Sequence, residues 1–248
     1  MLKDKAMKGK VNIHYWNQAN FLGLEQLVEQ LHADADYQLF AQYCYFRSKG
    51  LRKQAFKALD DFIGFCLQQP QTRQLEITLE MLSGIVQMPQ VHQLMAYPLS
   101  QWFKQVLLEQ KQNKSKNSLI YQWLAYLDHD VELYKQAYEL DQHNQMVLYA
   151  LSQFYLNQVD WQTHHLSESY FIGEIEHAYQ ALMQADFYLK QLQDDMIKNK
   201  IIDEYQYYKN LLDAWQKYCQ IQSKDSFFDW CTENKIVLSA ITTVYYQN

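Results

Sequence analysis

Glycine and proline are scarce in this chain, and their scarcity limits the folds that it can adopt. Only 6 of the 248 residues are glycine and 3 are proline. Sandwiches and barrels of short strands need many tight turns, for which these two residues are the usual choice. Apolar residues recur instead at steps of three and four, as in Leu24, Leu27, Val28 and Leu31, which is the period of a helix that buries one face. The sequence therefore predicts an all-α protein.

Two of the predicted helices are expected to form an antiparallel pair. Their apolar stripes, in residues 37–44 and 59–66, are separated by "SKGLRK", in which Gly50 is placed to end the first helix in a left-handed conformation. Farther along, "MPQ" at Pro89 and "YPL" at Pro98 are expected to bracket a short helix.

The last third of the chain carries further helix signals. A long helix is predicted after residue 194, and in "SFFD" the side chains of Ser226 and Asp229 are spaced for a capping-box start. Residues 236–248 are rich in β-branched side chains, but a lone strand would have no partner. We therefore expect a capping helix there.

Charge and polarity divide the chain into two halves. The polar run "EQKQNKSKNS", from Glu109 to Ser118, is a candidate boundary between an N-terminal helical half, 1–112, and a C-terminal half, 118–248, unless the chain is one continuous domain. Residues 1–124 hold 14 Lys and Arg against 10 Asp and Glu, whereas residues 125–248 hold 8 against 18. The acidic half is suited to a basic partner and unsuited to nucleic acid.

In the acidic half, the stretch "KQAYELDQHNQMVLYALSQFYL" has Ala137 in one helical segment and the polar run "DQHN" before the next. It resembles the tetratricopeptide repeat, in which one helix runs through a short linker into the next, with Ala137 at the small helix-crossing position and "DQHN" in place of the family's Asp-Pro-Asn-Asn. The large, Leu, small and Tyr positions are matched by Leu148, Leu151, Ser152 and Tyr155. Gln142 departs from the usual proline, and "WQTHHLSESYFIG" intervenes before the following helix.

A fainter likeness lies in residues 37–62, with Gly50 at the turn, Ala55 at the close-packing position and a bulky Tyr43 where a small residue is expected. The resemblance implies antiparallel helix pairs stacked as an α-solenoid, and an irregular helical bundle is the alternative architecture. It also implies a groove lined by Met146, Tyr149 and Gln153.

Motifs of common enzymes are missing from the sequence. Neither the dinucleotide loop GxGxxG nor the phosphate loop GxxxxGK[ST] is present, and GxSxG, HExxH and SxxK are missing as well. We therefore expect no catalytic residue and no cofactor. The four cysteines, Cys44, Cys66, Cys219 and Cys231, show no metal-binding spacing and are expected to be buried and reduced.

The segment "WQTHHLSESYFIGE", Trp161 to Glu174, is expected to be a loop that shapes the scaffold and presents a contact edge. Its candidate partner-binding residues are Trp161, His164, His165 and Tyr170. In the alternative hypothesis, His164, His165 and Glu168 bind a metal ion in a metal-dependent enzyme or metal sensor.

The leading hypothesis is a non-catalytic module that binds a protein or peptide, basic in its chemistry, as an adaptor or a toxin-neutralising immunity protein. The 20 tyrosines support a recognition surface. The chain has no apolar run of the length that a membrane span needs, so we expect a cytoplasmic protein with no membrane partner.

Overall fold

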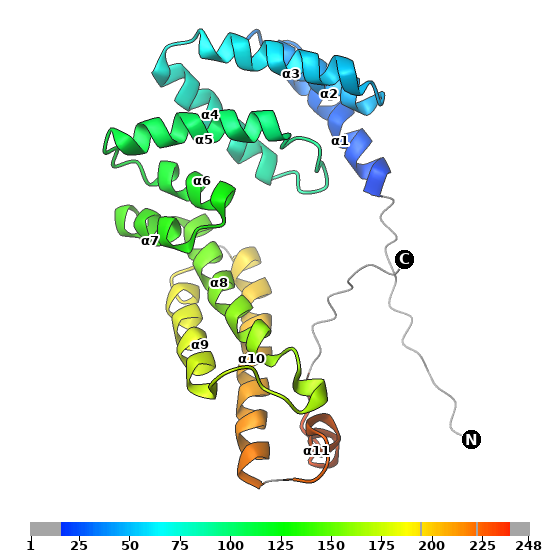
Figure 1. Cartoon of the computed structure of the whole chain (residues 1–248), viewed down its shortest axis with the longest axis vertical. Helices are drawn as coiled ribbons and strands as arrows, with labels where there is room; N and C mark the ends of the chain where they lie inside the picture. Colours follow the sequence, from blue (N-terminus) through cyan, green and yellow to red (C-terminus); the bar gives the residue numbers. More distant parts are fainter. Residues whose placement is uncertain (1–15, 194, 222, 239–248) are drawn as a thin grey trace, which may run out of the picture. The chain divides into compact units, whose positions relative to one another are not determined.

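The described part of the chain is built from helices joined by turns and loops, as the sequence predicts. The computed structural model (Figure 1) describes residues 16–193, 195–221 and 223–238, and these contain eleven α-helices, one short 3-10 helix and no strand. Contacts divide the chain into two compact units, Met1–Ser115 and Lys116–Asn248. None of the described helices is long and apolar enough to cross a membrane.

The first unit is built from helices that pack on their neighbours in the sequence. Helix α1 packs on α2, α2 on α3, and α5 on both α3 and α4. The bounds are α1 Trp16–Leu31, α2 Gln38–Ser48, α3 Arg52–Leu67, α4 Gln71–Val86 and α5 Tyr97–Gln112.

The turn between α2 and α3 confirms the prediction at Gly50. This glycine has a φ of 70°, its N–H donates to the Arg47 carbonyl at 3.1 Å, and the Leu51 N–H donates to the Phe46 carbonyl at 2.8 Å. These two bonds satisfy carbonyls that the end of a helix leaves without partners. The short turn then lets α3 return along α2.

The short helix predicted between Pro89 and Pro98 is wrong, because α5 begins at Tyr97 and the residues before it form irregular turns. The backbone of Gln93 is bound by other elements. Its N–H donates to Asn20 Oδ1 at 3.3 Å, and its carbonyl accepts from the Tyr43 hydroxyl at 2.5 Å. These tertiary bonds replace helical ones, and they also give the buried, bulky Tyr43 a polar partner.

The second unit continues the pattern of neighbouring helix pairs. Helix α6 packs on α7, α7 on α8, and α8 on α9, while α10 lies against both α8 and α9 (Figure 1). The bounds are α6 Ser118–Asp128, α7 Val131–Leu140, α8 Gln145–Thr163, η1 Leu166–Glu168, α9 Ile175–Leu189, α10 Asp195–Ile221 and α11 Phe227–Glu233.

Side-chain caps fix where these helices begin. Asp130 Oδ1 accepts from the N–H groups of Glu132 and Leu133, and Asn144 Oδ1 accepts from those of Met146 and Val147 in the first turn of α8. Ser226 caps α11 by accepting from the Asp229 N–H, as its spacing predicts. Each cap satisfies backbone donors that a helix start exposes. The long helix predicted after residue 194 is confirmed by α10.

The core of the second unit lies where α8, α9 and α10 meet. Of the positions that carry the repeat resemblance, Ala137, Leu148, Leu151 and Ser152 are fully buried and Tyr155 is partly buried. The predicted capping helix at 236–248 does not start where expected, because residues 236–238 follow α11 without helical structure, and the remaining residues lie outside the described part of the chain.

Candidate functional site

The segment Trp161–Glu174 is only partly a loop. Trp161, Gln162 and Thr163 form the last turn of α8, His164 caps its end, and the chain then enters η1. The prediction that this whole segment interrupts the helices is therefore wrong for its first three residues. These three residues continue the helical periodicity of α8. The prediction rested on the residue types within the segment and did not extend the periodicity of the preceding helix into it.

The two adjacent histidines have separate partners. His164 Nδ1 lies 2.7 Å from the Trp161 carbonyl oxygen, and His165 Nδ1 lies 3.0 Å from Glu168 Oε1. Their ring centroids are 4.1 Å apart. Within the described ranges, no group of three or more His, Cys, Asp or Glu side chains is arranged to hold a metal ion.

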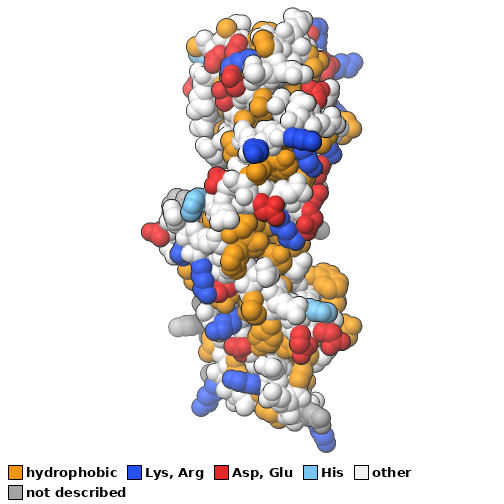
Figure 2. Space-filling model, turned by 90° about the vertical axis from the view of Figure 1, so that its left-hand side faces the viewer, with side chains coloured by type: hydrophobic (Ala, Val, Ile, Leu, Met, Phe, Trp, Pro, Cys, Tyr) orange, Lys and Arg blue, Asp and Glu red, His pale blue; other side chains and the backbone are white. Residues whose placement is uncertain are grey.

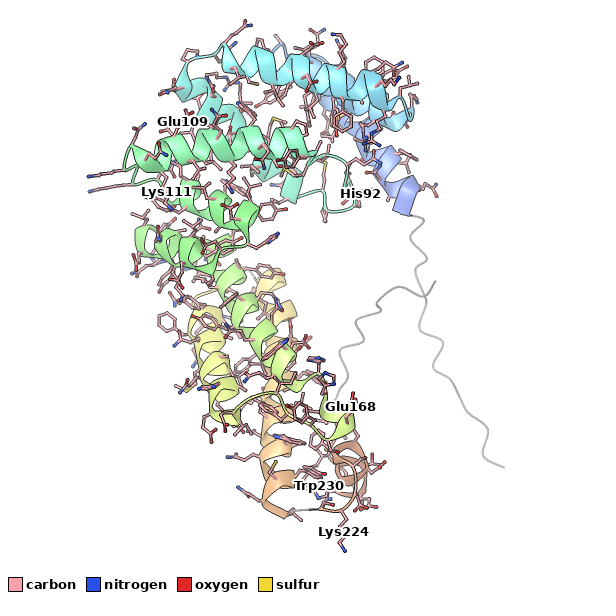
Figure 3. The ribbon with its side chains drawn as sticks, viewed as in Figure 1. His92, Glu109, Lys111, Glu168, Lys224 and Trp230 are labelled. Carbon is pink, nitrogen blue, oxygen red and sulfur yellow. The ribbon has the colours of Figure 1, made fainter. Side chains whose placement is uncertain are left out.

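The loop after η1 is fixed to the helices around it. The Ile172 N–H donates to the Gln162 carbonyl at 2.9 Å, and Ser169 Oγ accepts from the Phe227 N–H of α11 at 2.8 Å. The Phe171 ring stacks on Trp215 of α10, with centroids 6.0 Å apart. Figure 3 shows the same end of the unit, with Glu168 on η1 and Trp230 on α11, two elements that contact each other. These contacts make the loop part of the scaffold.

The predicted groove residues of α8 are partly covered by other elements. Gln153 Nε2 donates to both carboxylate oxygens of Glu204 on α10, at 3.0 and 3.1 Å. The Met146 sulfur accepts from Gln122 Nε2 at 3.1 Å, whereas Tyr149 stays exposed. Burial raises the pKa of the Glu204 carboxyl, because α8 and α10 remove part of its hydration.

A hollow lies on the surface of the α8–α9 pair, with a volume of about 430 Å³. We call it the α8–α9 hollow. Trp161 stands at its edge with 59% of its surface exposed, and Gln162 contributes a side chain that is only 8% exposed. The residues that line the hollow are Phe154, Asn157, Gln158, Trp161, Gln162 and His177.

Of the predicted site residues, only Trp161 lines this hollow, and His164, His165 and Tyr170 do not. The sequence analysis missed the other five lining residues. The sequence could have predicted that three of the lining residues share one face of a helix, because Gln158 follows Phe154 by four residues and Trp161 follows Gln158 by three. His177 comes from the next helix, and only the packing of α9 on α8 brings it there.

The charge around the hollow is one-sided. Residues 136–189, which include all of α8 and α9, contain seven acidic residues and no Lys or Arg. Glu174 precedes α9 and Glu176 lies in its first turn, and both are exposed. Figure 2 shows hydrophobic side chains beside a histidine and acidic groups on the face that it presents. An acidic, aromatic surface of this kind favours a cationic group.

Comparison with known proteins gives no relative for this chain. No protein family, no curated protein and no solved structure matches it.

Proposed function

We propose that the chain is a non-catalytic protein-binding module whose second unit holds a basic protein or peptide. In this proposal α6 to α10 form a tetratricopeptide-like stack of helix pairs, and the exposed face of α8 and α9 is the contact surface. The partner is bound as an adaptor binds its client or as an immunity protein binds a toxin.

One observation carries the proposal. The 54 consecutive residues 136–189, which include all of α8 and α9, carry seven acidic side chains and no Lys or Arg. A surface that merely keeps a protein in solution usually mixes charges of both signs. Charge of one sign speeds the approach of an oppositely charged partner and rejects partners of like charge.

Affinity capture from the native cell lysate, at low and at high salt, tests the proposal. We expect a stoichiometric partner with a basic segment, retained at low salt and released at high salt, because salt screens exposed charges. In the double variant Glu174→Gln, Glu176→Gln the same partner should bind more weakly, with a flatter salt dependence.

The matched control is the double variant Glu29→Gln, Asp60→Asn, which removes two exposed carboxylates from the first unit. It changes the net charge by the same amount, so a general charge effect would weaken binding in both variants equally. Equal weakening, or a partner that binds independently of salt, would contradict the assignment to the second unit.

The activity of the captured partner distinguishes the two roles. An immunity protein must block its toxin, so the complex should lack the activity of the free partner. An adaptor leaves its client active. In both cases the activity of the partner is measured in the complex and again after the partner is released at high salt. Adding the chain back to the released partner is the control.

A further inference from the structure

We propose that the α8–α9 hollow receives an arginine side chain of the basic partner. This inference rests on the protein-binding function proposed above and assigns that function a specific chemical group. Three features of the hollow carry it: an exposed indole, an available amide oxygen and an acidic edge.

The indole of Trp161 offers a face for a cation. More than half of this side chain is exposed, although its neighbours Gln162 and Thr163 are buried. The cation–aromatic contacts of the described residues all lie in the first unit, on Phe56 and Tyr45, so no cationic side chain of the described chain covers Trp161. A tryptophan ring is the preferred aromatic partner of a guanidinium group.

The amide of Gln162 offers an acceptor at the floor of the hollow. Its Nε2 faces the carbonyl oxygens of Ile172 and Glu174, at 3.4 and 3.5 Å, which orients the amide. No described residue donates a hydrogen bond to the Gln162 Oε1 atom, and this oxygen is not fully enclosed by the protein. It can therefore accept a hydrogen bond from a group that enters the hollow.

Glu174 brings an acidic residue next to the hollow. It is the N-cap residue of α9, and its backbone carbonyl oxygen lies 3.5 Å from Nε2 of Gln162, which lines the hollow. No described residue pairs with its exposed carboxylate. A carboxylate beside an aromatic face matches the charge and the planar donors of arginine.

The geometry favours arginine over lysine. A guanidinium group has five N–H donors in one plane, so it can stack on an indole and donate to an amide and a carboxylate at once. An ammonium group is a compact point charge that is more strongly hydrated. The larger hollow of the first unit, about 850 Å³ between α3 and α5, is lined by Asp60, Lys104 and Glu109, and this mixture selects neither sign.

The test uses the full-length protein and two synthetic peptides of equal length, one alternating arginine and glycine, the other lysine and glycine. Isothermal titration calorimetry gives their affinities. We expect the arginine peptide to bind more tightly, and Trp161→Ala to weaken its binding by about 5- to 30-fold, the range of a partly desolvated cation–aromatic contact. Trp161→Phe should restore part of the loss, and Glu174→Gln should reduce the salt dependence.

Tyr97→Ala and Glu29→Gln are the matched controls, because they remove an exposed aromatic side chain of α5 and an exposed carboxylate of α1, both in the first unit and outside the proposed contact surface. Circular dichroism verifies that every variant is folded. Unchanged arginine-peptide affinity in Trp161→Ala, or no binding of either peptide to the wild type, would overturn the arginine assignment. If the arginine assignment fails in this way but a natural partner is still captured in a salt-sensitive manner, the protein-binding function remains supported. Failure of the arginine assignment is therefore distinguishable from failure of the proposed function.

Discussion

At the scale of single residues, the four cysteines occupy two kinds of environment. Cys44, Cys66 and Cys231 are buried, whereas Cys219 is exposed on α10, so the expectation of four buried thiols is wrong for Cys219. Burial raises the pKa of the Cys44 and Cys66 thiols to about 12, because it removes the water that stabilises the thiolate. Thiolates are the reactive form.

We therefore expect a single fast thiol in the native protein. An aromatic disulfide reagent at mildly alkaline pH should label Cys219 first, and the buried cysteines should react only as the chain unfolds. Cys219→Ser should remove the fast phase and leave the slow one unchanged. Two or more fast equivalents in the wild type would contradict the burial of the other three.

A second prediction concerns the cap of α7. Asp130→Ala removes an acceptor from the N–H groups of Glu132 and Leu133. The free energy of unfolding should fall by about 1 kcal/mol, the usual cost of a lost N-cap. Urea denaturation measures the loss, and Asp130→Ser, which restores a capping oxygen, should recover most of it. A serine variant as unstable as the alanine variant would show that the cap is not the cause.

At the scale of elements, a polar seam joins α8 to α10. Besides the Gln153–Glu204 contact, the Tyr208 hydroxyl donates to Asp160 Oδ1 at 2.7 Å. Burial first, and then this hydrogen bond, raises the pKa of Tyr208, which keeps its hydroxyl a donor. The seam covers part of the α8 face that the repeat resemblance assigns to a groove, at Gln153, whereas Tyr149 stays exposed.

Glu204 makes the stability of this seam depend on pH. Its pKa is raised in the folded state, mainly by burial, so the folded state binds a proton more readily than the unfolded state. The ionised carboxylate therefore costs stability at neutral pH, and this cost disappears as the pH falls through the folded pKa. Glu204→Gln keeps an acceptor for Gln153 and should match or exceed wild-type stability at neutral pH. Urea denaturation should show that the difference in unfolding free energy between the variant and the wild type becomes smaller at acidic pH. A difference that grows at acidic pH would contradict the raised pKa of Glu204.

Two glycines of the first unit should respond oppositely to alanine. In α3, a Cβ on Gly64 would meet no atom within 4 Å, so Gly64→Ala should stabilise the protein by about 0.5–1 kcal/mol through a less flexible unfolded chain. Gly50 has positive φ, and Gly50→Ala should destabilise by about 1 kcal/mol or more. Thermal unfolding of both variants tests the pair, and shifts in the same direction would contradict it.

At the scale of the whole molecule, the chain divides between Ser115 and Lys116. We predict that a fragment of residues 116–248 is helical by circular dichroism and unfolds cooperatively, because the main packing contacts of α6 to α11 lie within that range. Residues 1–115 should behave likewise. A fragment that lacks a cooperative transition, while the full chain shows one, would mean that the units depend on each other for stability.

The helical class and most helix positions were predictable because their causes are local. Scarce glycine and proline, apolar steps of three and four, Gly50 at a turn and Ser226 at a cap act within a few residues of the chain. The error at residues 89–98 has the opposite origin, since Asn20 and Tyr43 bind Gln93 from 73 and 50 residues away. A local pattern carries no information on such partners.

The candidate site follows the same division. The sequence by itself determined an acidic second half and the absence of common catalytic motifs, but it placed Trp161 in a loop, whereas the structure places it in the last turn of α8. Only the tertiary structure decided that Glu204, 51 residues beyond Gln153, partly covers the predicted groove, and that His177 joins Phe154 and Trp161 around one hollow. Helical periodicity predicts which residues share one face of a helix. Which helix faces pack against each other depends on contacts between elements distant in the sequence, and the α8–α9 hollow exists only where the faces of two helices meet.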